Sequence, residues 1–238
     1  MFVKIEHITK SFGNQQILKD VSLELDAHAT LSILGKSGCG KTTLLKIIAG
    51  LLQPDGGNIL LHDININNTI ASKRDIVYIY QEPLLFPHLN VYENIAFGLK
   101  LRKLPSQEIQ ESVNRMIEEL QLNGHEKKLP DQLSGGQKQR VSFGRAIIVK
   151  PKLLLLDEPF GNLDTETRGT MQQLFKQICG TFGITSLFVT HDLKEALLIG
   201  DKFGYMQDGF LKIFDNKNAF ILDADTGVRD EINFWKNL

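Results

Sequence analysis

The pattern of apolar and polar residues predicts strands along the first third of the chain, interrupted by one helix. Strand-like alternation and short apolar runs recur there between turn residues. At Lys41 the pattern changes, because four apolar residues follow at helical spacing before Gly50 and Pro54 end the helix. The expected strands are residues 2–8, 21–25, 30–34, 59–61 and 76–79.

The strand pattern is absent between about Val91 and Val149, where we expect helices. Ser106 follows Pro105 and is a candidate N-cap for the first of them. A second helix is expected to open at Gly135-Gly136. The sequence therefore predicts a helical segment inserted in an α/β domain. On the first helix, an apolar stripe is expected at Ile109, Val113, Met116, Ile117 and Leu120.

The last third returns to alternating strands and helices. Residues 153–156 are four leucines, as expected of a parallel strand buried on both faces. Asp208-Gly209 separates two short strands and predicts a hairpin turn. We expect a small helical tail over residues 218–238 and no second domain. The other expected elements are helices at 165–179 and 193–199 and strands at 186–189, 203–207 and 210–214.

Composition narrows the class of protein. The 238 residues include 27 Lys+Arg and 28 Asp+Glu, which is not the basic excess of a nucleic-acid-binding protein. No apolar stretch is long enough to span a bilayer, and the first residues do not have the layout of a signal peptide. Two cysteines, Cys39 and Cys179, favour a reducing compartment without structural disulfides. We expect a soluble cytosolic protein that reaches a membrane only through a partner.

A glycine-rich loop follows the third predicted strand and precedes the first predicted helix. Its sequence, Gly35-Lys36-Ser37-Gly38-Cys39-Gly40-Lys41-Thr42, matches the phosphate-loop pattern G-x-x-x-x-G-K-[ST]. The glycines let the backbone wrap closely around phosphates, Lys41 adds a positive charge, and the Thr42 hydroxyl can bind Mg²⁺. The alternative is a plain strand–helix turn. The correct context favours a nucleotide-binding loop.

Polar residues also follow other predicted strands at their carboxyl ends, where ligands of open α/β sheets bind. Asp157 is placed to hold Mg²⁺, and Glu158 to polarise an attacking water and accept its proton. His191 is expected to contact the γ-phosphate, and Gln81 to contact Mg²⁺ or the lytic water. The alternatives are a capping carboxylate, a structural or solvated histidine and an ordinary loop amide. The remaining histidines are expected at the surface: His7, His28, His62, His88 and His125.

A second phosphate cradle is predicted at Leu133-Ser134-Gly135-Gly136-Gln137. A serine and two glycines at the start of a helix offer backbone N–H groups to an anion. Because one chain carries two such half-cradles, we expect ATP to lie between two copies.

An apolar loop follows Gln81. Its three residues Leu84-Leu85-Phe86 lie between Pro83 and Pro87. Exposed apolar runs are typical of docking surfaces. The alternative is that the loop is buried within the helical insertion.

These motifs, in this order, resemble the nucleotide-binding subunits of ATP-binding-cassette transporters, from Phe2 to about Phe214. The resemblance implies an α/β fold with a P-loop NTPase-type parallel sheet core, an N-terminal antiparallel β region and an inserted α-helical subdomain. It implies one ATPase domain over residues 1–238. Its expected parts are a core at about 1–87 and 151–215, a helical subdomain at about 88–150 and a short tail at about 216–238.

The resemblance also assigns roles to residues. It places catalytic roles on Glu158, His191, Gln81 and Lys41. It places metal ligation on Thr42, Gln81 and Asp157. Phe12 falls where the family stacks an aromatic ring on adenine. The expected nucleotide contacts are Phe12, Gly35, Lys36, Ser37, Gly38, Cys39, Gly40, Lys41, Thr42, Thr43, Ser134, Gly135, Gly136, Gln137 and Asp164.

Some positions depart from the family pattern. Lys36 stands where a proline is common, and residues 27–29 replace a usual Gly-Glu turn. Ser142 and Gly144 lie in the helix after the second cradle, where alanines are frequent, and the glycine should weaken that helix by up to about 1 kcal/mol. These departures affect the expected efficiency and remove no functional atom. Cys39 is expected to be inert, the alternative being a thiol whose pKa is lowered by the helix N-terminus.

The segment Gln81–Leu89, followed by Glu93-Asn94-Ile95, looks like importers for oxyanions, iron, polyamines or sugars. The resemblance implies an ATPase that uses ATP and Mg²⁺ and pairs head to tail with a second copy or another cassette. It implies permease subunits as partners on the cytoplasmic face of the membrane, with a substrate-binding protein as a further candidate and no nucleic acid.

Three alternatives to an importer subunit remain open at this point. They are a soluble ABC-type ATPase without a transporter, an exporter subunit, and a binding module with inactive motifs. Many importer subunits carry a C-terminal regulatory domain, and without one we expect no inhibition through such a domain.

Overall fold

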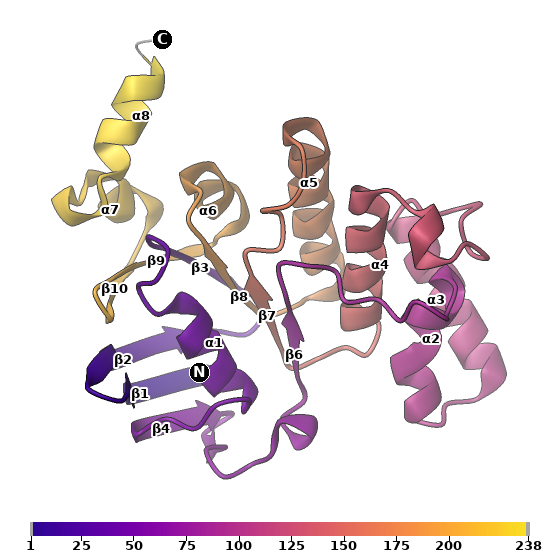
Figure 1. Ribbon diagram of the computed structural model, residues 1–238, viewed down its shortest axis with the longest axis horizontal. Helices are drawn as coiled ribbons and strands as arrows, with labels where there is room; N and C mark the ends of the chain where they lie inside the picture. The colour runs from indigo at the N-terminus through magenta and orange to yellow at the C-terminus, as the bar shows by residue number, and fades with distance from the viewer. Residues whose placement is uncertain (1, 237–238) are drawn as a thin grey trace. The chain divides into compact units, whose positions relative to one another are not determined.

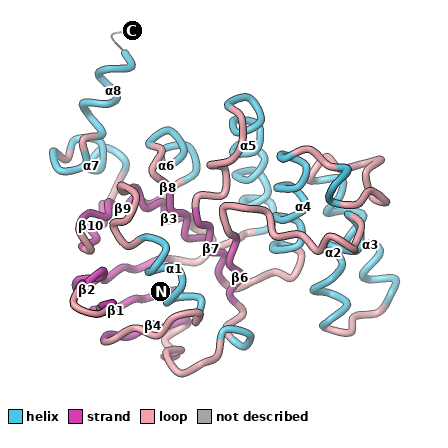
Figure 2. The backbone as a smooth tube through the Cα atoms, viewed as in Figure 1, coloured by secondary structure: helices cyan, strands magenta, loops and turns pink. Residues whose placement is uncertain are grey.

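The structure is a computed structural model that describes residues 2–236. Its contacts divide the chain into two units, which are described separately. Figure 1 labels the helices and strands, and Figure 2 colours them by type. Unit 1 comprises residues 1–76 and 185–238, and unit 2 comprises residues 77–184. The mixed α/β class is confirmed, with a parallel-strand core and an antiparallel β region. The expected division into core, helical subdomain and tail stays a prediction.

Unit 1 begins with an antiparallel sheet in the order β2-β1-β4-β5. Its first two strands extend further than the apolar alternation predicts, because backbone pairing continues to Phe12 opposite Gln15 at the hairpin. The side chains near that hairpin are mostly polar or exposed, so the alternation does not mark them. The strands are β1 (Val3–Phe12), β2 (Gln15–Leu25), β4 (Gly56–Leu61) and β5 (Ile64–Asn65).

A parallel arrangement follows in the same unit. β3 (Thr30–Leu34) pairs in parallel with β8 (Ser186–Thr190) and with β9 (Lys202–Gln207). All residues of β3 and β8 are buried, as in strands covered on both faces. β10 (Phe210–Phe214) pairs antiparallel with β9, which confirms the predicted hairpin. The helices α1 (Lys41–Ala49) and α6 (Leu193–Ile199) follow β3 and β8.

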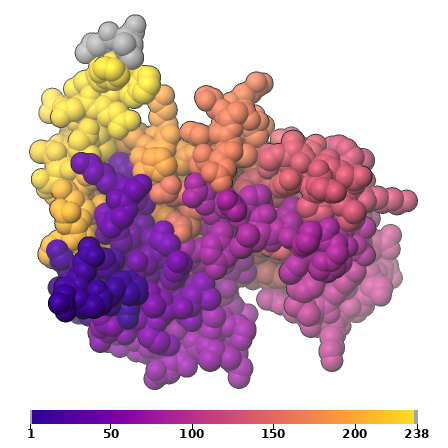
Figure 3. Space-filling view, in the orientation of Figure 1, coloured from indigo at the N-terminus to yellow at the C-terminus, as the bar shows by residue number. Residues whose placement is uncertain are grey.

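The helical tail is confirmed as far as residue 236, and the last two residues of the prediction lie outside the described residues. It contains α7 (Lys217–Leu222), a 3₁₀ turn at Ala224–Thr226 and α8 (Val228–Lys236). The fully buried Phe220 ring stacks on Phe203, with ring centroids 5.2 Å apart. The atoms of this segment gather in one region of the space-filling view (Figure 3).

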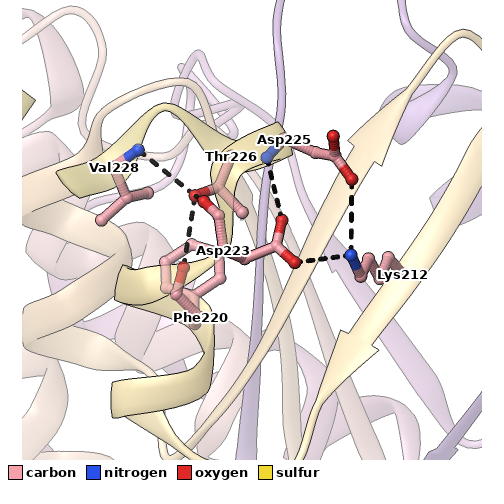
Figure 4. A network of polar contacts seen from close by, with 6 residues as sticks. All are labelled: Lys212, Phe220, Asp223, Asp225, Thr226 and Val228. Carbon is pink, nitrogen blue, oxygen red and sulfur yellow. Dashed lines mark hydrogen bonds and ion pairs between the residues drawn. The ribbon is translucent and has the colours of Figure 1, made fainter. Parts of the chain in front are cut away.

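Polar contacts also hold the tail against β10 (Figure 4). Lys212 pairs with Asp223 and, at 3.4 Å, with Asp225. The Thr226 hydroxyl donates to the Phe220 and Asp223 carbonyls at 3.2 and 2.8 Å, and it accepts from the Val228 N–H. The tail is therefore a packed part of unit 1.

Unit 2 contains the strand β7 (Leu153–Asp157) and all of β6 (Ile76–Ile79) except its first residue, and the two strands are neighbours in a sheet. The helical segment expected between Val91 and Val149 is confirmed, but it has one helix more than the pattern suggested. The helices of that segment are α2 (Val91–Leu101), α3 (Ser106–Glu119) and α4 (Gly135–Ile147), with a 3₁₀ turn at Pro130–Gln132. Unit 2 also contains α5 (Thr165–Phe182), which follows β7. The expected apolar stripe of α3 is buried.

Two helix starts differ from expectation. α2 was not predicted, although Asn90 and Glu93 form a capping box at its start, with the Glu93 N–H donating to Asn90 Oδ1 at 2.8 Å. The expectation that Ser106 caps α3 is wrong. Pro105 is the N-cap, and its carbonyl accepts from the Ile109 N–H at 3.0 Å, so Ser106 is already the first helical residue.

Arg74 closes the C-terminal end of α1 in unit 1. Its side chain is buried at 2% exposure. Nη1 donates to the carbonyls of Ile47 and Ile48 at 3.0 and 2.9 Å. Nη2 and Nε donate to the carbonyls of Asn67 and Thr69 at 3.0 and 2.8 Å. One guanidinium thus satisfies the end of the helix that follows the glycine loop.

We expect Arg74→Ala to destabilise the protein by about 3 kcal/mol, because four carbonyls lose a charged donor. Urea unfolding should show a lower midpoint with an unchanged slope. The adjacent, exposed Lys73 offers the control, since Lys73→Ala should change stability by no more than about 0.5 kcal/mol. Equal midpoints for the two variants would contradict this role.

Candidate functional site

The glycine loop between β3 and α1 has a wrapped backbone. Gly40 lies at φ 114°, which a side chain would strain, and a Cβ at Gly35 would stand 2.4 Å from the Met206 carbonyl oxygen. Lys41 is only 5% exposed, and its Nζ donates to the carbonyls of Gly35 and Lys36 at 2.6 and 2.9 Å. The lysine charge is thus held inside the curve of the loop.

The start of α1 fits a phosphate. Among the described residues, no side chain caps this helix at Gly40. The first N–H groups of a helix lack intrahelical partners, and the helix dipole favours an anion beside them. A phosphate at this end would meet both the helix dipole and the Lys41 charge. The contacts expected from Gly35 to Thr43 stay predictions.

His191 lies at the same sheet edge as the glycine loop. β3 and β8 pair in parallel with Leu34 opposite Thr190, and the Gly35 N–H donates to the Thr190 carbonyl at 3.3 Å. The next residue along β8 is His191, which is exposed. Unit 1 therefore brings the loop and this histidine to the same edge of the sheet. The expected contact of His191 with the γ-phosphate stays a prediction.

A cavity of about 560 Å³ adjoins the glycine loop, a volume typical of small-molecule sites. It lies between the β1–β2 hairpin, the loop and the β9–β10 turn.

Phe12, at the end of β1, is 51% exposed and has Lys10 Nζ 5.6 Å from its ring centre. Burial raises the pKa of the Cys39 thiol, which agrees with an inert cysteine. The lining residues are Gln15, Gln16, Ile17, Lys19, Lys36, Ser37, Gly38, Cys39, Tyr205, Met206, Gln207, Asp208 and Gly209.

In unit 2, the two carboxylates lie at the end of β7. Tyr78 on β6 donates its hydroxyl hydrogen to Asp157 Oδ2 at 2.6 Å. Glu158 has φ 47°, a left-handed conformation that is costly for a residue with a side chain. Its carbonyl accepts from the Gly161 N–H at 3.1 Å, which closes a tight turn. β7 therefore ends at Asp157, and the chain turns at Glu158.

Gln81 reaches the same turn. Its Nε2 donates to Asn162 Oδ1 at 3.3 Å, and a Cβ at Gly161 would stand 2.8 Å from that nitrogen. Asp164, expected to contact nucleotide, caps α5 by accepting from the Thr167 N–H at 3.0 Å. That bond lowers the pKa of Asp164. Gln81, Glu158 and the segment around Asn162 are thus gathered in one place.

The second cradle opens α4 as predicted. The Gln137 N–H donates to Ser134 Oγ at 3.3 Å, and the Ser134 N–H donates to Gln137 Oε1 at 3.0 Å, which is a capping box. Ser134 and Gly135 are exposed. A Cβ at Gly136 would stand 2.6 Å from Thr167 Cγ2 on α5, so this glycine is also required for helix packing. The Ser134 hydroxyl accepts one bond and can still donate its hydrogen.

His125 corrects one expectation, because it is not a plain surface residue. Its side chain is half-buried, and its Nε2 lies 3.0 Å from Gln137 Nε2. Since Gln137 Oε1 already accepts from Ser134, the amide nitrogen faces the imidazole, and His125 Nε2 must be the acceptor. The ring then carries its hydrogen on Nδ1, which has no hydrogen-bond partner among the described residues. Neither the hydrophobic periodicity nor a sequence motif predicts this contact between His125 and Gln137.

The loop after Gln81 is partly exposed and firmly anchored. Leu84 is 55% exposed, whereas Leu85 and Phe86 are half-buried. Asn94 is fully buried; its Oδ1 accepts from the Phe86 N–H at 2.9 Å, and its Nδ2 donates to the Phe86 and Leu89 carbonyls at 3.2 and 2.8 Å. Leu84 is exposed enough to belong to a docking surface, as one interpretation of the loop predicted. Phe86 agrees better with the alternative, in which the loop is buried within the helical insertion.

Arg145 connects this loop to α4 and was missed by the sequence analysis. Its Nη2 donates to the Leu84 carbonyl at 2.6 Å, and its guanidinium lies 4.9 Å from the centre of the Phe86 ring. The helix that begins with the second cradle therefore ends on the apolar loop.

Gly144 on α4 has a packing reason that the sequence did not reveal. A Cβ there would stand 2.5 Å from Leu120 Cδ1 and 3.3 Å from Ile95. The close approach of α4 to its neighbours offsets the expected loss of helix propensity.

The donor chemistry fits Mg²⁺. Within residues 2–236, no group of three or more His, Cys, Asp or Glu side chains could hold a metal ion. Mg²⁺ is commonly bound by one or two carboxylates together with substrate phosphates. Taken one by one, the hydroxyl of Thr42 in unit 1 and the amide oxygen of Gln81 and carboxylate of Asp157 in unit 2 are oxygen donors of the kind that Mg²⁺ prefers. Among the described helices, none combines the length and apolar character that crossing a membrane requires.

The chain is similar to known import ATP-binding proteins. "Spermidine/putrescine import ATP-binding protein PotA" of Acetivibrio thermocellus is 44% identical over 229 residues, 93% of this chain and 65% of the relative. PotA of Clostridium acetobutylicum is 46% identical over 209 residues, 88% of this chain and 59% of the relative. "Fe(3+) ions import ATP-binding protein FbpC" of Photobacterium profundum is 41% identical over 208 residues, 87% of this chain and 59% of the relative.

This chain therefore spans between 59 and 65% of the length of these three relatives. The family described as "ABC transporter" matches residues 18–161, more than half of the chain. The matched segment begins in β2 and ends just after Glu158, so it includes the glycine loop, the second cradle and both carboxylates of β7. The chain belongs to the ABC transporter family.

Proposed function

We propose that this chain is the ATP-hydrolysing subunit of an ABC importer. The observation that carries the proposal is the glycine loop, with buried Lys41 beside a helix start that no described side chain caps. That arrangement suits a triphosphate, whose charge a backbone cradle and a fixed ammonium can stabilise. Family membership and the import names of the relatives support the same assignment.

Two copies would close head to tail over two ATP molecules. Lys41 and Thr42 of one copy would hold each triphosphate from one side. Ser134 and Gly136 of the other copy would hold it from the opposite side, the Ser134 hydroxyl donating its hydrogen. The physical reason for closure is that γ-phosphate charge is best stabilised by donors on both faces.

Hydrolysis would use the residues after β7. Glu158 would accept the proton of the attacking water, and Gln81 and His191 would orient the water and the γ-phosphate. Mg²⁺, when bound through Thr42, Gln81 and Asp157, would neutralise charge on the β- and γ-phosphates. Loss of the γ-phosphate would remove the bridge between the copies and let the dimer open.

The membrane partners would dock at the apolar loop. Leu84 is exposed, and Asn94 and Arg145 hold the loop backbone in place. We propose transmembrane permease subunits as the occupants, on the cytoplasmic face, with a substrate-binding protein as a further partner. The relatives named for polyamine and Fe(3+) import favour an importer over an exporter or a free soluble ATPase. The cargo would be recognised by the other subunits.

The sandwich can be tested by mixing two inactive variants, Lys41→Ala and Ser134→Arg. Each variant alone carries the same defect in both sites of its dimer. A mixed dimer has one doubly damaged site and one intact site, because each site takes Lys41 from one copy and Ser134 from the other. We expect an equal mixture to recover about a quarter of wild-type ATPase activity, since half of the dimers are mixed and each has one intact site.

The control is each variant mixed with itself at the same total concentration, which should remain inactive. A mixture that stays inactive although mixed dimers are detected by a tag on one variant would contradict the head-to-tail arrangement.

A further inference from the structure

Tyr78 makes a short hydrogen bond to the carboxylate that follows β7. Its hydroxyl lies 2.6 Å from Asp157 Oδ2, which is the distance of a strong, charge-assisted bond. β6 and β7 are neighbouring strands, so the tyrosine reaches the carboxylate from within unit 2. No motif in the sequence connects residues 79 positions apart.

The surroundings keep Tyr78 a donor. The phenol is half-buried, and its ring packs against Tyr80 with centroids 4.5 Å apart. Burial first, and then the bond to Asp157, raise the pKa of Tyr78 far above its usual value. An ionised carboxylate only accepts hydrogen bonds, so the shared hydrogen belongs to the tyrosine and Tyr78 is the donor.

The terminal torsion of an aspartate is broad, with two nearly equivalent orientations. A strong bond to Oδ2 restricts that torsion. Partners of this kind orient the ligands of metal sites, and removing them commonly costs about 10- to 100-fold in metal affinity.

We propose that Tyr78 is a positioning residue for Asp157, fixing the orientation in which this carboxylate meets the Mg²⁺ of the nucleotide. The inference rests on the proposed function, since it deepens the role given there to Asp157. A purely structural tie between β6 and β7 is the competing explanation. The two differ in what they predict for metal binding, as opposed to stability.

The test compares Tyr78→Phe with Tyr80→Phe, which makes the same chemical change at an exposed neighbour, 40% accessible. Both are made in a Glu158→Gln background so that ATP is not consumed. The probe is Mn²⁺ in the presence of saturating ATP, titrated by electron paramagnetic resonance. We expect Mn²⁺ affinity to fall about 10- to 100-fold for Tyr78→Phe. Tyr80→Phe should keep the parent affinity.

Two further measurements make the result decisive. Urea unfolding without nucleotide reports whether Tyr78→Phe is folded, and Tyr78→Met repeats the test with a different apolar side chain. Unchanged Mn²⁺ affinity in the folded variants, whether or not their stability falls, would overturn the inference and leave the proposed function standing. If even the parent protein fails to bind ATP, the proposed function fails and takes the inference with it.

Discussion

Glu158→Gln is expected to bind ATP and accumulate as a dimer, while hydrolysing ATP at least about a hundredfold more slowly than the wild type. Glutamine keeps the shape of the side chain and loses the basic oxygen that would accept a proton from water. Binding should survive, because the proposed phosphate contacts are made by the glycine loop and by Ser134 of the other copy. Phosphate release gives the rate, and gel filtration with ATP and Mg²⁺ gives the dimer.

A matched control is Glu166→Gln, an exposed glutamate in the first turn of α5 in the same unit. It should hydrolyse ATP at the wild-type rate. A Glu158→Gln protein that remained monomeric with full activity would mean that another group is the base and that closure is not part of the cycle.

Lys41→Ala should lose ATP binding by about a hundredfold or more, because the change removes a charged donor from a buried position in the loop. It also removes the bonds from Nζ to the Gly35 and Lys36 carbonyls, at 2.6 and 2.9 Å, that help to hold the loop curved. Isothermal titration calorimetry with ATP measures the affinity.

Lys46→Ala is the control for this variant. Lys46 lies in the same helix, carries the same charge and is exposed, so its removal should change the affinity little. Urea unfolding of both variants separates loss of the fold from loss of binding. Wild-type affinity in a folded Lys41→Ala protein would rule out the glycine loop as the triphosphate site.

The sequence predicted those elements whose signal is local. β3 and α6 have the predicted bounds, and β8 extends one residue beyond its predicted end. The strands carry a short, mostly apolar run and α6 carries apolar residues at helical spacing, so each signal lies within the element itself. Asp208-Gly209 fixed the last hairpin through its own turn preference. α2 was not predicted as a separate helix, although Asn90 and Glu93 form a capping box at its start.

The sequence predicts those parts of the candidate site that lie in short motifs. The glycine loop, the second cradle and the two carboxylates at the end of β7 can each be recognised from a few consecutive residues. Tyr78, Arg74 and Arg145 do not, because each acts on backbone or side chains far away in sequence. Such contacts exist only after folding, so no period or spacing reveals them.

The left-handed backbone at Glu158 has an evolutionary consequence. Glycine adopts a φ of 47° with less strain than glutamate, but glycine has no carboxylate. A lineage selected only for thermal robustness would drift away from glutamate here, and one selected for turnover would retain it. Selection for stability and selection for turnover therefore oppose each other at position 158. A substitution that stabilises the protein there is expected to lower its activity.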